Sequence, residues 1–258
     1  MKLGFEDTGQ ASYDSGSQSA RVITEAWAFA NAFCPNCGSE RLSKFPNSRP
    51  VADFYCGTCD EEFELKSTKA KIGNKLVDGA YQTMRDRLMS DKCSNLFILK
   101  YSLKYQSVES LFIIPKQFFV PEVIEQRRPL SAEAKRAGWV GCNILIGQIP
   151  ELGKIHIVKN GIVRDKLPVL LQWKESLFLR DSGRESRGWL LNVLKCVEDI
   201  GKAEFTLDEV YAFEYRLKKI YPDNSHVREK IRQQLQVLRD KGRVAFLGRG
   251  RYRYAWKD

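Results

Sequence analysis

Residues 34–67 read CPNCGSERLSKFPNSRPVADFYCGTCDEEFELKS and combine two Cys-x-x-Cys pairs with a split Asp…Glu-x-Lys pattern. The pairs are Cys34 with Cys37 and Cys56 with Cys59. Asp53 lies three residues before the second pair, and the Glu-x-Lys pattern begins at Glu64, five residues after it. One short stretch therefore carries thiolates that can hold a metal ion next to carboxylates and a lysine of the kind that hydrolytic sites use.

The two cysteine pairs predict a structural zinc site. Zinc prefers four thiolates in a tetrahedron, and each Cys-x-x-Cys turn presents two sulfurs on the same side of a knuckle. Four cysteine ligands close the coordination shell, so we do not expect this zinc to be the catalyst. Redox-active dithiols are the alternative. The remaining cysteines are expected to be small buried apolar residues; they are Cys93, Cys142 and Cys196.

The Asp…Glu-x-Lys pattern predicts a hydrolytic site that uses a divalent cation. On a strand, alternate side chains share a face, so Glu64 and Lys66 should point the same way while Phe63 and Leu65 point into the core. Asp53 belongs to a second strand of alternating character, and pairing of the two strands would bring both carboxylates and the ammonium together. Oxygen ligands can hold Mg²⁺ beside a scissile phosphate, and a cation can orient the attacking water.

Other interpretations of these residues stay open at this point. Taken alone, the pattern fits a charged strand face exposed to solvent better, with Lys66 in a surface ion pair. Glu61 and Glu62 also compete with Glu64 as metal ligands, and Glu62 shares its parity. We prefer Glu64 because it has a lysine two residues later and apolar neighbours on both sides.

The charge of the chain is uneven. The 258 residues are 43% hydrophobic and carry a formal net charge of +10. Residues 183–258 hold 7 Lys and 10 Arg against 11 Asp and Glu, a net charge of +6. This asymmetry predicts a polyanionic partner, with a basic soluble surface as the alternative. No stretch resembles a secretory signal or reaches membrane-spanning length, so we expect a cytoplasmic protein without a membrane partner.

Hydrophobic periodicity predicts an α/β domain with a mixed sheet, followed by a smaller domain. We expect helices over 18–32 and 76–89, strands over 51–56, 62–67, 95–101 and 109–115, and a hairpin over 155–163. The stretch 180–188 is polar, punctuated by glycine and without apolar periodicity, so it is predicted to be a linker. We therefore divide the chain into domains over 1–182 and 183–258.

The second domain is predicted to be a winged helix. Residues 206–209 (TLDE) have the spacing of a capping box that opens a helix. The next helix has an apolar stripe formed by Val227, Ile231, Leu235 and Leu238. Its opposite face carries Glu229, Arg232, Gln233 and Gln236. Two short runs, 243–247 and 251–256, then flank Gly248-Arg249-Gly250 and predict a basic hairpin, the wing.

The chemistry of this domain suits DNA. Glutamine can bond adenine and arginine can bond guanine in the major groove, while wing arginines can meet phosphates. The candidate DNA-binding residues are Arg228, Arg232, Gln233, Gln236, Arg249, Arg251 and Arg253. A protein-binding winged helix is the alternative, but the segment 241–257 has six basic residues and no acidic one, which argues against it.

Five segments together resemble the DpnI-type methyl-directed restriction endonucleases. They are CPNCG (34–38), RPVADFYC (49–56), EEFELKS (61–67), RAGWVGCN (136–143) and KIRQQLQVLRDK (230–241). Residues 50–53 with 64–66 also resemble the split Pro-Asp…(Asp/Glu)-x-Lys site of the restriction-endonuclease superfamily. The resemblance extends over nearly the whole chain, although the first twenty residues and the final five match less well.

This resemblance implies a type II site-specific deoxyribonuclease of a restriction-modification system. We infer no obligate protein partner from the sequence. Its substrate would be double-stranded DNA at GATC sites whose adenine carries an N6-methyl group. Carried over to this sequence, it makes Asp53, Glu64 and the Leu65 carbonyl the Mg²⁺ ligands and places Lys66 near the attacking water. It also makes Trp139 a DNA-contacting aromatic residue, for which packing within the protein is the alternative.

Two other functions stay compatible with the sequence. One is a catalytically silent zinc-ribbon and winged-helix reader of methylated DNA, such as a transcriptional regulator. The other is a nuclease of the same fold with a different sequence or modification preference. Substitution Lys66→Ala separates enzyme from reader, because only an enzyme would lose cleavage and keep binding.

Overall fold

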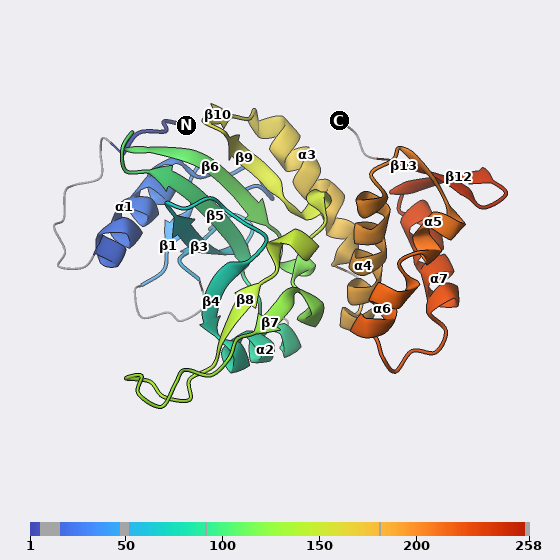
Figure 1. The fold of residues 1–258 in the computed structure, drawn as a ribbon. Coiled ribbons are helices and arrows are strands. Elements are labelled where there is room, and N and C mark those ends of the chain that lie inside the picture. Colours follow the sequence, from blue (N-terminus) through green and yellow to red (C-terminus); the bar gives the residue numbers. More distant parts are fainter. Residues whose placement is uncertain (6–15, 47–51, 91, 181, 256–258) are drawn as a thin grey trace.

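The computed structural model describes residues 1–5, 16–46, 52–90, 92–180 and 182–255 (Figure 1). Several predicted features lie outside these residues: Pro50 and Val51 of the hydrolytic motif, with Val51 the start of the strand predicted at 51–56, and Trp256 at the end of the wing. Among the helices that are described, none combines the length and the apolar character needed to cross a bilayer.

The larger half of the molecule is built on a mixed sheet. Within the described residues, seven strands pair in the order β1-β2-β3-β5-β6-β9-β10. β3 and β5 run parallel, and the other neighbours are antiparallel. The strands are β1 (Ser43–Lys44), β2 (Phe54–Tyr55), β3 (Glu62–Thr68), β5 (Asn95–Ser102), β6 (Ser107–Ile114), β9 (Ile155–Lys159) and β10 (Ile162–Val163). The predicted α/β fold with a mixed sheet is confirmed.

The central strands are buried on both faces, as their nearly continuous apolar sequences require. In β5, Phe97 and Leu99 pack into one apolar cluster, while Leu96 and Ile98 pack into another. Glu64 pairs with Leu96, and Lys66 pairs with Ile98, across the parallel β3–β5 ladder. Because paired residues share a face, the predicted hydrolytic side chains lie on the Leu96 face of the sheet.

Helices α1 (Gly16–Asn31) and α3 (Lys166–Ser176) cover the Phe97 face of the sheet (Figure 1). Their indoles, Trp27 and Trp173, are among the largest fully buried side chains. The opposite face is covered by helix α2 (Tyr81–Met89) and by a small antiparallel sheet of order β4-β8-β7. The strands of this sheet are β4 (Leu76–Ala80), β8 (Gly141–Ile144) and β7 (Ile124–Gln126).

The helix predicted at 76–89 is half wrong. Its first five residues form β4, and only Tyr81–Met89 are helical. β4 pairs with β8, more than sixty residues later in the chain, so a distant strand determines its conformation. Between β6 and α4, the described residues form five short 3₁₀ turns: η1 (Lys116–Phe118), η2 (Pro121–Val123), η3 (Ile146–Gln148), η4 (Glu151–Gly153) and η5 (Leu177–Leu179).

The C-terminal half is a helical domain with a three-stranded sheet, as a winged helix requires. Its helices are α4 (Arg184–Ile200), α5 (Leu207–Tyr211), α6 (Glu214–Ile220) and α7 (Val227–Asp240). Its strands are β11 (Glu204–Thr206), β12 (Val244–Gly248) and β13 (Arg251–Tyr254), in the order β11-β13-β12. The predicted capping box at Thr206 and Glu209 is present, and the predicted apolar stripe of α7 is buried.

The predicted linker at 180–188 is also half wrong, because α4 begins at Arg184. A side-chain carbon at Gly188 would come within 2.6 Å of the Glu122 carboxylate and 3.0 Å of the Tyr221 hydroxyl. Next to it, the Trp189 ring stacks on Tyr221, with centroids 3.9 Å apart. The polar, glycine-containing sequence thus reflects close packing at a junction rather than a flexible connection.

The two halves share one apolar cluster. It extends from Leu96 and Ile98 of the main sheet through α4 to the buried stripe of α7. Hydrogen bonds also cross the junction: Arg216 Nη2 to Gln148 Oε1 at 2.7 Å, Arg243 Nη2 to the Glu175 carbonyl at 2.6 Å, and the Glu151 N–H to Glu198 Oε1 at 3.0 Å. Because the core runs across it, the domain boundary after residue 182 stays a prediction.

Candidate active site and metal centre

The four predicted cysteines form a compact cluster. Their Sγ atoms all lie within 4.8 Å of one another, with Cys34 and Cys59 3.6 Å apart and Cys37 and Cys56 3.5 Å apart. A disulfide bond would need about 2 Å, whereas Zn–S bonds of about 2.3 Å in a tetrahedron separate sulfurs by ~3.8 Å. Within the described residues, this is the one group of three or more His, Cys, Asp or Glu side chains close enough to hold a metal ion. The cluster can therefore bind an ion such as zinc.

The two cysteine knuckles have the same backbone design. In each, the N–H of the first cysteine donates to the carbonyl five residues later: Cys34 to Ser39 and Cys56 to Glu61. The carbonyl of that cysteine in turn accepts from the N–H four residues later, at Gly38 and Asp60. Both of these residues have positive φ, 79° and 57°. The matching turns aim the two thiol pairs at one point.

Backbone amides also tune the thiols. Burial opposes ionisation of Cys56, but the N–H groups of Thr58 and Cys59 and the thiol of Cys37 outweigh it and lower the pKa of Cys56 to about 7. The deeper Cys34 has a raised pKa, chiefly because of burial. A thiolate is the form that binds a metal ion, so the knuckle already favours the ligand state at Cys56.

The predicted hydrolytic residues converge at β3. The Asp53 N–H donates to the Phe63 carbonyl at 2.9 Å, which anchors the residue before β2 against β3. Its side chain folds back onto the same strand, because Asp53 Oδ2 accepts the Leu65 N–H at 2.7 Å. As predicted, Phe63 is buried and Leu65 packs against the same apolar cluster, while Glu64 and Lys66 occupy the other face.

Lys66 is held between two carboxylates. Its Nζ lies 2.8 Å from Glu64 Oε1 and 2.6 Å from Asp78 Oδ1. Burial acts to lower the pKa of Lys66, but the two carboxylates outweigh it and raise that pKa. Sequence reasoning missed Asp78, whose side chain is only 7% exposed, because the strand that carries it was predicted to be helical.

Asp53 lies among charges from helix α1 as well. Arg21 Nη2 is 3.5 Å from Asp53 Oδ1, and the same guanidinium pairs with Glu25 one helical turn later. Burial is the main cause that raises the pKa of Asp53, and the carboxylates of Glu25 and Glu64 add to it. A carboxylate whose pKa is raised in this way, as that of Asp53 is, is typical of a site that a cation would stabilise. With only Asp53 and Glu64 as acidic ligands, Mg²⁺ would also need carbonyl and water oxygens.

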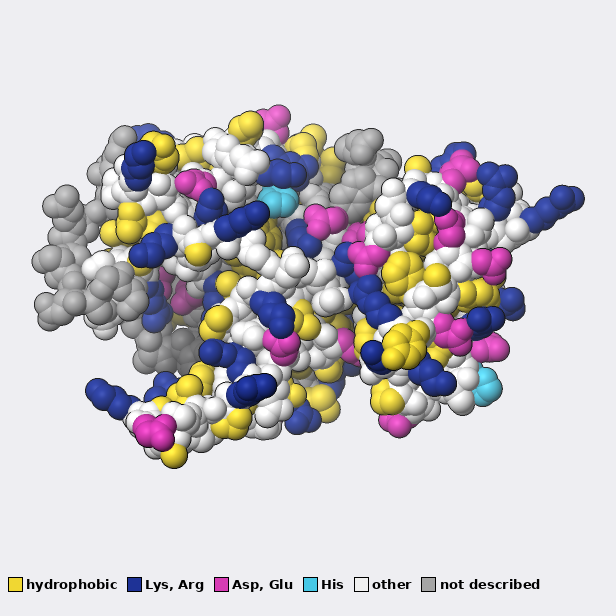
Figure 2. Space-filling model, viewed as in Figure 1, with side chains coloured by type: hydrophobic (Ala, Val, Ile, Leu, Met, Phe, Trp, Pro, Cys, Tyr) yellow, Lys and Arg dark blue, Asp and Glu magenta, His cyan; other side chains and the backbone are white. Residues whose placement is uncertain are grey.

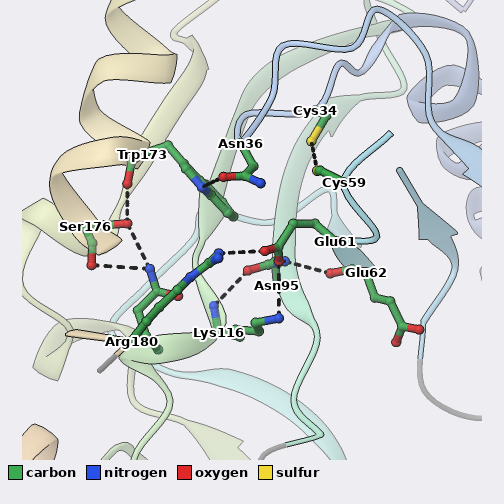
Figure 3. Close-up of polar contacts among 11 residues, drawn as sticks. Cys34, Asn36, Cys59, Glu61, Glu62, Asn95, Lys116, Trp173, Ser176 and Arg180 are labelled. Atoms are coloured by element: carbon green, nitrogen blue, oxygen red, sulfur yellow. Dashed lines mark hydrogen bonds and ion pairs between the residues drawn. The ribbon is translucent and has the colours of Figure 1, made fainter. Parts of the chain in front are cut away.

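Glu61, a competing ligand in the sequence, is committed elsewhere. Its buried carboxylate accepts from Arg180 at 2.7 Å and from Asn95 at 2.8 Å, and it lies 3.3 Å from the Lys116 ammonium (Figure 3). These partners come from three other segments, whereas Lys66 pairs with Glu64 and Asp78. The preference for Glu64 over Glu61 therefore has a structural reason.

Trp139 lies on the long loop between β7 and β8, next to the small sheet that carries Asp78. The Arg136 guanidinium is 4.3 Å from the centre of its ring, and a side-chain carbon at Gly141 would come within 2.8 Å of the ring. The indole is thus half-buried against its own loop. Its contact with DNA stays a prediction, as do the roles of Asp53, Glu64, the Leu65 carbonyl and Lys66.

The candidate base-reading residues share the exposed face of α7. Arg228, Arg232, Gln233 and Gln236 are exposed, on the side opposite the buried stripe. The two arginines lean on Tyr211 of α5, where Arg232 donates to the phenol oxygen, and Arg228 Nε donates to Glu214 at 2.7 Å. The two glutamines are exposed as well, and Gln233 Oε1 accepts from Gln234 Nε2 at 3.4 Å.

The wing arginines divide into two kinds. Arg251 and Arg253 both pair with Glu204 of β11, at 3.1 and 2.7 Å. Arg249 occupies the tip of the hairpin in a left-handed conformation, with φ of 49°. The pattern in residues 241–257 could not reveal Glu204, since this carboxylate comes from a strand 47 residues before Arg251 and 49 before Arg253. On the face drawn in Figure 2, Lys and Arg side chains lie over both halves of the molecule.

Two family models match the chain. The DpnI model, described as the Dam-replacing family, matches residues 1–182. Its C-terminal counterpart, described as the Dam-replacing HTH domain, matches residues 185–254. The two matches support a methylation-dependent restriction enzyme with a DNA-binding helix-turn-helix domain. Because the first match alone covers more than half of the sequence, the chain belongs to the Dam-replacing family.

Proposed function

We propose that this protein is a Mg²⁺-dependent endonuclease that cleaves double-stranded DNA at GATC sites carrying N6-methyladenine. The observation that carries the catalytic part is the cluster on β3, in which Lys66 is clamped between Glu64 and Asp78 beside Asp53. The GATC sequence and the methyl mark come from the family resemblance. The helix-turn-helix match supports DNA as the partner.

The ionic state of the cluster limits what each residue can do. With a raised pKa, Lys66 is an ammonium at neutral pH and has no lone pair with which to accept a proton. We therefore assign it to orienting the attacking water and to stabilising the negative charge that develops on the phosphate, and not to general-base catalysis. Asp78 holds it in place as a positioning residue.

Asp53, Glu64 and the Leu65 carbonyl would hold Mg²⁺. The Leu65 N–H holds the Asp53 carboxylate at the strand. Leu65 would thus orient one metal ligand through its N–H and supply another through its own carbonyl oxygen. When bound there, Mg²⁺ supplies Lewis-acid stabilisation of the scissile phosphate. Zinc at the four cysteines would have a structural role, because a complete thiolate shell leaves no open position for a substrate.

The test is digestion of one plasmid prepared with and without GATC adenine methylation, each in Mg²⁺ and in chelator. We expect cleavage of the methylated plasmid in Mg²⁺ alone. The Lys66→Ala variant should still bind this DNA without cutting it. Retained binding with no cleavage by the wild-type chain would instead identify a silent reader of methylated DNA.

A further inference from the structure

A cavity of about 600 Å³ lies where the larger half meets the winged helix. Lys116 of η1 and Arg180 after η5 line it from one side, and Arg184 and Arg187 of α4 line it from the other. Leu88, Cys93 and Phe119 contribute apolar surface. Among the lining residues that the structure describes, none carries a carboxylate.

A buried carboxylate behind the wall keeps two of these cations in place. Glu61 pairs with both Arg180 and Lys116 (Figure 3). Burial alone would raise the pKa of Glu61, but Asn95, Lys116 and Arg180 outweigh it and lower that pKa. One ionised carboxylate is therefore shared by two cations of the wall and balances the charge of only one of them.

The cavity adjoins the candidate active site. A second, smaller cavity of about 20 Å³ is lined by Glu64 and Arg87 and shares Cys93 and Phe119 with the first. Arg87 Nη1 lies 3.6 Å from Glu64 Oε2, and Arg184 Nη1 lies 3.1 Å from Met89 Sδ at the end of the same helix. Basic side chains therefore continue from Glu64 along α2 to the start of α4.

We propose that this cavity binds a backbone phosphate of the same DNA that occupies the active site, with Arg184 and Arg187 as the contacting groups. The inference rests on the proposed function, that the substrate is duplex DNA. Phosphates repeat along each strand, so a duplex whose scissile phosphate lies at Glu64 presents further phosphates nearby. A guanidinium binds a phosphate through two parallel hydrogen bonds, and an arginine pair at a concave surface suits one phosphate group.

Such a contact would position the duplex without reading its sequence. Arg184 and Arg187 belong to the first helix of the winged-helix half, whereas Lys116 and Arg180 belong to the larger half. One phosphate held between them would couple the two halves to the same stretch of backbone. The scissile bond would then be placed relative to the junction as well as relative to α7.

The test is the salt dependence of binding to a methylated GATC duplex, with Ca²⁺ in place of Mg²⁺ so that the DNA stays intact. Each phosphate contact contributes about 0.9 to the slope of log Kd against log salt concentration. We expect the Arg184→Gln/Arg187→Gln variant to lose about 1 from this slope. The Arg184→Lys/Arg187→Lys variant should retain most of it, because the charge is kept.

The control is Lys104→Gln/Lys174→Gln, which removes the same charge from exposed positions that line neither cavity. Its slope should equal that of the wild type, and thermal unfolding should show all variants folded.

An unchanged slope in the Arg184→Gln/Arg187→Gln variant, while the wild type cleaves DNA normally, would overturn this inference but not the proposed function. A phosphate-dependent rise in the wild-type melting temperature, lost in that variant while the slope stays unchanged, would also overturn it and would assign the cavity to free phosphate. A wild-type chain that bound no duplex would overturn both this inference and the proposed function.

Discussion

Lys66 is the residue whose chemistry depends most on its neighbours. An isolated lysine on a strand is a solvated cation, but here two carboxylates lie within 2.8 Å and raise its pKa. Glu64 is also a predicted metal ligand. Asp78 is therefore the partner whose removal changes Lys66 without removing a predicted ligand of Mg²⁺.

Substitution Asp78→Asn should slow cleavage of methylated DNA by about 10- to 100-fold, because a slightly misplaced catalytic group loses that much. The Kd for DNA should stay unchanged. The pKa of Lys66 should fall once one of its two carboxylates is gone, so the alkaline limit of the pH–rate profile should move to lower pH. Single-turnover rates across pH measure both effects.

Asp86→Asn is the matched control, since Asp86 lies on the exposed side of α2, where its carboxylate accepts from Gln82 Nε2 at 2.8 Å. It should leave the pH profile in place. A profile that moves equally in both variants would contradict the positioning role of Asp78.

We expect the Asp53 carboxylate to be needed for cleavage but to lower the stability of the metal-free protein. Its pKa is raised by burial and by nearby carboxylates, so the folded chain binds this proton more tightly than the unfolded chain does. The stabilisation from that proton is fully present below the unfolded pKa and is lost as the pH rises through the folded pKa. At neutral pH the ionised carboxylate therefore destabilises the metal-free protein.

Substitution Asp53→Asn should accordingly abolish cleavage and raise the free energy of unfolding in chelator by about 0.5–2 kcal/mol at pH 7. The gain should shrink as the pH falls and wild-type Asp53 takes up its proton. Urea unfolding at several pH values measures this trend. A variant less stable than the wild type at pH 7 would show that the Leu65 N–H bond outweighs the burial of the charge.

At the scale of elements, the two cysteine knuckles connect the metal centre to the catalytic strand. The second knuckle ends at Asp60, and β3 starts at Glu62. The first is tied to α3, because Asn36 Oδ1 accepts the Trp173 indole N–H at 2.9 Å. A bound zinc would therefore hold the start of β3 and the helix packed behind the sheet in one arrangement.

Substitution Cys56→Ser should remove the metal, lower the free energy of unfolding by more than about 2 kcal/mol and reduce cleavage. Elemental analysis of the purified chain, together with thermal unfolding, gives both numbers. Cys93→Ser is the control, because Cys93 lies outside the four-cysteine cluster. One zinc per chain in the Cys56 variant would refute the assignment.

At the scale of the whole molecule, the apolar core passes from the main sheet through α4 into the winged helix. Arg243 and Arg216 add hydrogen bonds to Glu175 and Gln148 across the junction. Elements that share one core lose their packing together. The two halves should thus behave as one cooperative unit, although the sequence suggests two domains.

We expect tryptophan fluorescence and far-ultraviolet circular dichroism to report one coincident thermal transition for the whole chain. Arg243→Ala should lower its midpoint and keep the transition single, since the apolar contact persists. Two separated transitions in the wild-type chain would contradict the shared core and would favour independent domains joined at residue 182.

Local signals in the sequence determined much of this protein. The spacing of the cysteines predicts the metal centre, the alternation around Glu64 predicts which side chains share a face of β3, and the capping box and apolar stripe predict α5 and α7. Each of these depends on residues close together in the chain, whose geometry follows from one turn, strand or helix. The predicted mixed sheet follows from the same short-range patterns.

Only the tertiary structure decided which distant residues complete each site. Asp78 reaches Lys66 because β4 pairs with β8, Glu204 reaches the wing because β11 pairs with β13, and Gly188 is buried because α4 packs on Glu122. The same long-range packing turned a predicted linker into a junction with a basic cavity. Such contacts produce no periodic pattern of residues within one segment, because they depend on where the fold brings separate elements together.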